Sequence, residues 1–193
     1  MLSKNELRPV FKKIRAGLDK DIKRIYDKQI CNNVINSPQF KICDLIMLYY
    51  PLCDEIDTTM ILDAAILQNK DVCYPKCNKA EKTMRFYLVD GKGCFEKGAY
   101  GICEPSEHNA ASLENYKNVL CIVPCLSCDD YGIRLGYGAG YYDKYFANCK
   151  KPITKIALCY EACRESRLIS DEYDIAVDYI ATQNSLTEAK NEQ

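Results

Sequence analysis

The sequence lacks a dominant charge and a long apolar run. Its 26 Lys and Arg residues balance 27 Asp and Glu residues, for a net charge of −1. It therefore has neither the basic field that holds nucleic acid nor a polybasic surface for a membrane. No apolar run approaches the roughly 20 residues of a bilayer-spanning helix, and residues 1–6 lack the apolar core of a signal peptide. We expect a cytoplasmic protein that binds no nucleic acid and no membrane.

Several catalytic motifs are also absent. The sequence has no Walker P-loop, and its glycines at 136, 138 and 140 are spaced G-x-G-x-G rather than as the dinucleotide motif G-x-G-x-x-G. With His108 as the single histidine and no Ser-His-Asp or Cys-His arrangement, covalent acyl chemistry lacks support. Phosphoryl transfer is still compatible with the sequence, because that reaction depends mainly on positioning, cations and a metal ion.

Cysteine, by contrast, is abundant, with 13 residues. The odd number excludes complete internal pairing, and residues such as Cys121 and Cys159 lie inside apolar runs, where cysteine acts as a small apolar residue. Reduced thiols in the cytosol fit this pattern best.

Two cysteine spacings permit a zinc site. Cys125 and Cys128 form C-x-x-C, and Cys73 and Cys77 form C-x-x-x-C, so the four thiolates could bind one zinc ion. Chance is the simpler explanation, because 13 cysteines in 193 residues produce such pairs readily. We expect no zinc.

The length and the hydrophobic pattern predict one α/β domain over residues 1–193, with a mostly parallel twisted sheet and helices on both faces. A capping box of Ser3 and Glu6 opens the first helix, and Asp19 precedes a second, with Ile22, Ile25, Ile30 and Val34 expected to face inward. Further helices are predicted at 58–67 and 141–148. Strands are predicted at 42–50, 72–74, 84–89, 119–123, 153–160 and 176–181, a long loop at 91–109, and a frayed end at 188–193.

The most informative stretch runs from Arg134 to Asp143, RLGYGAGYYD. Its alternating glycines let the backbone approach a ligand with N–H groups exposed. Arg134 provides a planar cation for phosphate oxygens, and Asp143 provides a hard oxygen ligand for magnesium. A plain turn between strand and helix is the alternative, but the flanking arginine and aspartate favour a nucleotide site.

Two shorter clusters leave their roles open. Glu55 and Asp57 lie between a buried strand and a helix; Asp57 and Thr58 suit helix capping, whereas Glu55 suits capping or N–H groups of a heterocyclic ligand equally well. Lys4 and Arg8 lie one turn apart on the first helix. Taken alone, they are more typical of a solvated basic face.

These motifs occur in the order found in 5-formyltetrahydrofolate cyclo-ligases, also called 5,10-methenyltetrahydrofolate synthetases, and the chain resembles that family over nearly its whole length. The specific block V-P-x-L-x-x-D-x-x-G-x-R-L-G-x-G-x-G-Y-Y-D spans 123–143. The shorter matches are Lys4 with Arg8, the block from Tyr49/Tyr50 to Thr58, the G-x-x-G-I-x-E-P block (Gly98, Gly101, Ile102, Glu104, Pro105), and Asp174 with Asp178 before Tyr179-Ile180-Ala181-Thr182.

The resemblance implies an enzyme that uses ATP and Mg²⁺ to convert 5-formyltetrahydrofolate into 5,10-methenyltetrahydrofolate. We expect it to be a monomer. The resemblance also implies catalytic roles for Arg134, Tyr142 and Asp143, and metal ligands at Asp143 and Asp178. The implied ATP-binding residues are Lys4, Asn5, Glu6, Leu7, Arg8, Arg134, Leu135, Gly136, Tyr137, Gly138, Ala139, Gly140, Tyr141 and Tyr142. The implied folate-binding residues are Tyr50, Glu55, Tyr137, Gly138, Ala139, Gly140 and Tyr141.

The chain departs from the family pattern at a few positions. Cys125 replaces a common glycine and Cys128 a common phenylalanine; both resemble packing replacements and weaken the zinc hypothesis further. Cys163 and Tyr173 replace a common glutamine and histidine near the site, and Ala139 occupies a variable position. Two rivals are a noncatalytic binding module, which the intact cationic, metal and folate positions oppose, and a sugar-phosphate or other phosphotransferase, which the Glu55 block opposes.

Overall fold

The computed structural model describes residues 2–90, 95–98, 103–105 and 109–191. Its main feature is a seven-stranded sheet in the order β12-β11-β9-β6-β1-β2-β3. The run from β11 to β2 is parallel, and β12 and β3 pair antiparallel at the two edges. The strands are β1 (Leu45–Met47), β2 (Asp71–Asn78), β3 (Thr83–Leu88), β6 (Val119–Pro124), β9 (Thr154–Leu158), β11 (Tyr179–Ala181) and β12 (Leu186–Glu188). The predicted mostly parallel sheet is confirmed.

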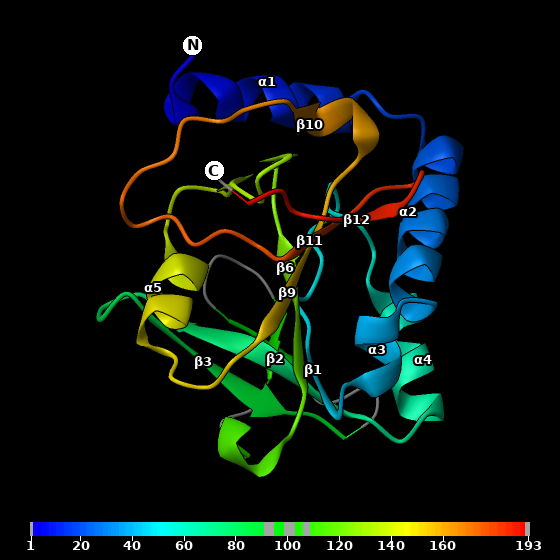
Figure 1. Cartoon of the computed structure of the whole chain (residues 1–193), viewed down its shortest axis with the longest axis vertical. Helices are drawn as coiled ribbons and strands as arrows, with labels where there is room; N and C mark the ends of the chain where they lie inside the picture. The colour runs from blue at the N-terminus through cyan, green and yellow to red at the C-terminus, as the bar shows by residue number, and fades with distance from the viewer. Residues whose placement is uncertain (1, 91–94, 99–102, 106–108, 192–193) are drawn as a thin grey trace.

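The central strands are apolar throughout because both faces of the sheet are covered. Every residue of β1 is buried, and so are residues 119–123 of β6. Continuous apolar runs of this kind are typical of parallel strands between two layers of helices. On one side of the sheet lie α2 (Lys20–Ile35), α3 (Pro38–Ile42) and α4 (Thr59–Leu67), and on the other lies α5 (Tyr141–Asn148) (Figure 1).

The first helix, α1 (Lys4–Ala16), crosses one end of the molecule near β10 (Arg164–Glu165) (Figure 1). Its predicted capping box is present, since Ser3 accepts from the Glu6 N–H and Glu6 accepts from the Ser3 N–H. Within the described residues, no helix combines the length and the apolar character needed to cross a bilayer.

Two small sheets were not predicted. One joins β7 (Ser127–Asp129), β8 (Arg134–Leu135) and β10, and the other pairs β4 (Phe95–Lys97) with β5 (Cys103–Pro105). The latter pair lies inside the predicted loop at 91–109, so that prediction was wrong for these residues. Strands of two or three residues are too short for a hydrophobic period to emerge from the sequence.

Other boundaries also differ from expectation. The strand predicted at 42–50 covers only 45–47, because Ser37 caps the short helix α3 and leaves Ile42 exposed at its end. Ile30 and Val34 are buried as predicted, but Ile22 and Ile25 are exposed, so the inward-facing prediction was wrong for the first half of α2.

The chain end is more ordered than predicted. Leu186–Glu188 forms the edge strand β12 against β11. Beyond it, the Ala189 N–H donates to the Asp178 carbonyl and the Lys190 N–H to the Asp130 carbonyl, both at 2.9 Å. The fraying predicted from 188 is therefore wrong for residues 188–190.

Gly132, in the turn between β7 and β8, provides a test of this packing. It has φ +79°, and a Cβ there would lie 2.3 Å from the Val177 carbonyl oxygen. We expect Gly132→Ala to lower the free energy of unfolding by at least about 2 kcal/mol, from left-handed strain plus the clash. Gly140→Ala is the control: φ is +67° but nothing lies within 4 Å of its Cβ, so the loss should be near 1 kcal/mol. Equal losses in urea unfolding would contradict the clash.

Candidate active site

The glycine-rich loop, residues 136–140, connects β8 to α5. Gly138 has φ +103° and Gly140 has φ +67°, conformations that a residue with a side chain rarely adopts. Gly140 occupies the N-cap position of α5. The loop thus leads into a helix N-terminus, where free N–H groups favour an anion.

Arg8 of α1 lies directly on this loop. Its Nε donates to the Gly136 carbonyl oxygen at 3.0 Å, and Nη1 donates to Asn5 Oδ1 at 2.5 Å. A Cβ on Gly138 would come within 3.2 Å of the Arg8 guanidinium carbon. The bare backbone at Gly138 therefore lets the cation approach the loop closely.

Arg134, Tyr142 and Asp143, the predicted catalytic residues, are brought together. Arg134 Nη2 donates to Asp143 Oδ1 at 2.6 Å, and its guanidinium lies 5.6 Å from the centre of the Tyr142 ring. Arg134 is only 8% exposed. Among the described residues, the buried Arg134 Nε and the Tyr142 hydroxyl have no hydrogen-bond partner. Buried polar groups usually have partners, so these two suit a polar ligand.

Lys4 is not a solvated cation. Its Nζ pairs with Asp171 at 2.8 Å and also with Asp174. Burial lowers the pKa of the Lys4 amine, but the hydrogen bonds and charges of both aspartates outweigh it and raise the pKa above 10.5. Ile175, which follows Asp174 in the chain, donates its N–H to Asp143 Oδ1 at 3.3 Å. Lys4 is therefore linked indirectly, through Asp174 and Ile175, to the Arg134–Asp143 pair. The interpretation of Lys4 as part of a solvated basic face is wrong.

The two predicted metal ligands differ in their surroundings. Asp143 Oδ1 is occupied by Arg134 and Ile175, whereas its Oδ2 accepts no hydrogen bond within the described residues. Asp178 Oδ2 accepts from the Lys155 N–H at 2.6 Å and lies 3.0 Å from the Lys155 Nζ, and Asp178 Oδ1 accepts from the same Nζ at 3.2 Å. Magnesium usually takes one or two carboxylates and completes its shell with phosphate oxygens and water. Asp143 fits this role, while Asp178 would have to share its carboxylate with Lys155.

Glu55 does not cap a helix. Its side chain is buried and accepts from the Leu52 N–H at 2.8 Å. Burial raises the pKa of Glu55 above 4.5, although this bond, the nearby Tyr137 hydroxyl and the Arg15 guanidinium oppose the rise. Asp57 instead caps α4 by accepting from the Thr59 N–H at 2.9 Å.

Thr58 was expected to help cap α4, but its side chain makes no cap bond. Its hydroxyl donates to the Tyr49 carbonyl at 3.1 Å, inside the core. Because Asp57 caps α4 and Glu55 instead accepts from the Leu52 N–H, helix capping does not explain the Glu55 carboxylate.

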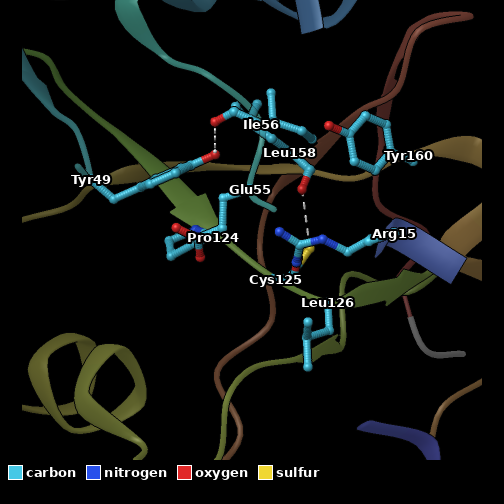
Figure 2. Close-up of a pocket in the computed structure, with 9 residues that line it drawn as sticks. All are labelled: Arg15, Tyr49, Glu55, Ile56, Pro124, Cys125, Leu126, Leu158 and Tyr160. Atoms are coloured by element: carbon cyan, nitrogen blue, oxygen red, sulfur yellow. Dashed lines mark hydrogen bonds between the residues drawn. The ribbon is translucent and has the colours of Figure 1, made fainter. Parts of the chain in front are cut away.

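Arg15 is the residue that the sequence interpretation missed. It is buried on α1, and its guanidinium donates to the Tyr137 hydroxyl and to the carbonyls of Asp54 and Cys125. Figure 2 shows it reaching toward a cavity of roughly 10 Å³ that Glu55 also lines. Its position seven residues after Arg8 continues the helical spacing of Lys4 and Arg8, the one signal that pointed to it.

Tyr50 lies at the border of a larger cleft. It is 38% exposed and, with Leu52 and Tyr74, lines a cleft of about 600 Å³ between α2 and the start of α4. Of the remaining positions, Tyr141 packs partly against the core, Cys163 is buried and Tyr173 is exposed. His108, Gly101 and Ile102 lie outside the described residues.

The cysteines give a prediction about metal content. Cys73 and Cys77 lie on β2, whereas Cys125 follows β6 and donates its thiol to the Leu158 carbonyl at 3.3 Å. Every cysteine in the described ranges is a free thiol, and those ranges hold no group of three His, Cys, Asp or Glu suited to a metal. We expect metal analysis of protein purified without chelator to find no stoichiometric zinc, and reducing agent to leave Tm unchanged. One zinc per chain that is lost on Cys125→Ser would contradict this.

The mostly parallel sheet with helices on both faces defines an α/β protein. Arg8 on the glycine-rich loop and Arg134 beside Asp143 make this loop a candidate site for an anionic ligand. A profile of the 5-formyltetrahydrofolate cyclo-ligase family matches residues 1–183. The chain belongs to this family, and the resemblance seen in its motifs is confirmed.

Individual relatives agree. The probable 5-formyltetrahydrofolate cyclo-ligase of Schizosaccharomyces pombe is 30% identical over 151 residues, which are 76% of this chain and 72% of that protein. The 5-formyltetrahydrofolate cyclo-ligase of Haemophilus influenzae is 24% identical over 89% of this chain and 93% of its own. The NMR structure of Aquifex aeolicus 5,10-methenyltetrahydrofolate synthetase aligns with a TM-score of 0.84 and 29% identity, covering 98% of this chain and 94% of that one.

Proposed function

We propose that this enzyme converts 5-formyltetrahydrofolate into 5,10-methenyltetrahydrofolate in a reaction driven by ATP and dependent on Mg²⁺. The observation that carries the proposal is that Arg8 bonds the glycine-rich loop while Arg134 pairs with Asp143 beside it. Lys4 lies close by, paired with Asp174, whose neighbour Ile175 donates its N–H to Asp143. We further propose that it works as a cytoplasmic monomer, with residues 1–193 as one domain. Free thiols throughout the described residues are consistent with a reducing compartment.

The proposed roles follow from the contacts. The glycine-rich loop, with Arg8 and Arg134, would hold the nucleotide phosphates, because exposed N–H groups and guanidinium forks both match phosphate oxygens. Asp143, and Asp178 less directly, would hold Mg²⁺, which would neutralise phosphate charge. Glu55 and Tyr137 would bind the folate, since Glu55 is a buried acceptor for ring N–H groups.

The chemistry explains why ATP is needed. A formamide oxygen is a poor leaving group, so the formyl oxygen first attacks the γ-phosphorus and ADP departs. N10 then attacks the activated formyl carbon, loses its proton, and phosphate leaves as the ring closes. The protein's tasks are alignment and charge stabilisation, for which Arg134 beside the loop is suited.

A direct assay tests the proposal. Purified protein is mixed with 5-formyltetrahydrofolate and Mg-ATP, and the absorbance of the methenyl product is followed. We expect a signal that depends on ATP, is abolished by a magnesium chelator, and is accompanied by one phosphate per product. Folate binding without any ATP-dependent product would support the noncatalytic binding module instead.

A further inference from the structure

Arg15 is a buried cation that joins three segments distant in sequence. Its side chain is 3% exposed. Nε donates to the Asp54 carbonyl at 2.8 Å, and Nη1 donates to the Cys125 carbonyl and to the Tyr137 hydroxyl, both at 3.2 Å. Burying a guanidinium is costly unless its N–H groups find partners. Here those partners come from the loop after β1, from the end of β6 and from the glycine-rich loop.

The segments that Arg15 joins carry the proposed folate contacts. Asp54 immediately precedes Glu55, and the Tyr137 hydroxyl that accepts from Arg15 is close enough to Glu55 to lower the pKa of its carboxyl. The planar fork of an arginine fixes its partners in direction as well as in distance. Arg15 thus holds the loop that carries Glu55 and the Tyr137 side chain in one arrangement.

We propose that Arg15 is a positioning residue for the folate: it fixes the Glu55 loop against Tyr137 and so sets the geometry of the folate-binding carboxylate. This rests on the proposed function. Arg15 itself does not touch the substrate in this role.

Arg15 also acts on Glu55 through its charge. Burial raises the pKa of Glu55, and attraction to the Arg15 guanidinium opposes the rise. Without Arg15, the pKa of Glu55 would be higher still, and the carboxylate would become protonated at a higher pH. Other titratable groups also surround Glu55 and act on its charge. They are Tyr137 of the glycine-rich loop, Tyr142 of α5, Tyr49 after β1 and Asp54 in the same loop as Glu55. Lys23 of α2 donates to the Glu55 carbonyl.

The test compares Arg15→Met with Lys13→Met, an exposed lysine on the same helix. For Arg15→Met we expect the KM for 5-formyltetrahydrofolate to rise about tenfold, the loss from hydrogen bonds to a charged group, with a smaller change in the KM for ATP. The acidic limb of a plot of folate KM against pH should also move to higher pH. Lys13→Met should change neither quantity.

A second variant separates charge from geometry. Arg15→Lys keeps the positive charge but loses the planar guanidinium and its directed hydrogen bonds. In this variant the rise of folate KM at acidic pH should begin near the same pH as in the parent, while folate KM itself remains raised. It also carries the test if Arg15→Met fails to fold. Parent protein without turnover would defeat the proposed function. If the parent protein turns over normally and the Arg15 variants keep its folate KM and its dependence of folate KM on pH, only the positioning role is ruled out.

Discussion

The substitution Asp143→Asn is expected to lower kcat about 100- to 1,000-fold, the scale of losing one charge-stabilising group in an active site, while the protein remains folded. Asparagine keeps an oxygen that can accept from Arg134 and from the Ile175 N–H, so the local hydrogen bonds survive. It removes the negative charge that balances the buried Arg134 and would bind Mg²⁺. Turnover should be measured across a magnesium titration, together with Tm.

Asp178→Asn is the matched control for this change. Its carboxylate is 43% exposed and already paired with Lys155, so we expect a smaller loss of kcat than for Asp143→Asn. Near-normal kcat for Asp143→Asn at every magnesium concentration would show that the metal assignment is wrong.

Glu55→Gln is expected to weaken folate binding about tenfold to a hundredfold. The glutamine oxygen can still accept from the Leu52 N–H, but part of the carboxylate becomes a donor, and one folate N–H loses its acceptor. A buried donor left without a partner costs about 1–3 kcal/mol, and 1.4 kcal/mol is a factor of ten. ATP affinity should barely change, because the phosphates are proposed to bind at Arg134 and the glycine-rich loop.

The pH dependence of this variant gives an independent check. Only ionised Glu55 accepts freely, and burial raises its pKa above 4.5, so folate affinity should fall as the pH drops through that raised value. Glu55→Gln should abolish this fall. Asp57→Asn is the control: it caps α4, and we expect a change in Tm alone. A purely thermal effect of Glu55→Gln, with folate affinity intact, would rule out its folate role.

Elements with a strong local signal could be predicted from the sequence. The predicted helix at 141–148 matches α5, because a glycine precedes it and its apolar residues follow a helical period. The strand predicted at 119–123 matches β6 to within one residue, because it is continuously apolar. The mostly parallel order of the sheet followed from alternating strands and helices.

Features that depend on distant partners could not be predicted. The bonds of Arg15 reach 39, 110 and 122 residues along the chain, so its helical spacing after Arg8 could not show which groups it contacts. Lys4 seemed solvated for the same reason, since Asp171 and Asp174 lie 167 and 170 residues away. Similarly, β12 is three residues long and is stabilised by its pairing with β11 rather than by its own composition.

The pairing of Lys4 with Asp171 and Asp174 has a consequence for biosynthesis. The ribosome makes Lys4 of α1 167 and 170 residues before its ionic partners Asp171 and Asp174. Strand β1 likewise waits for β6, more than 70 residues later, before its second edge is paired. A nascent chain therefore carries an apolar strand with one edge unpaired until β6 has been made, and exposed strand edges favour aggregation. A chain that ends before residue 171 therefore lacks both ionic partners of Lys4.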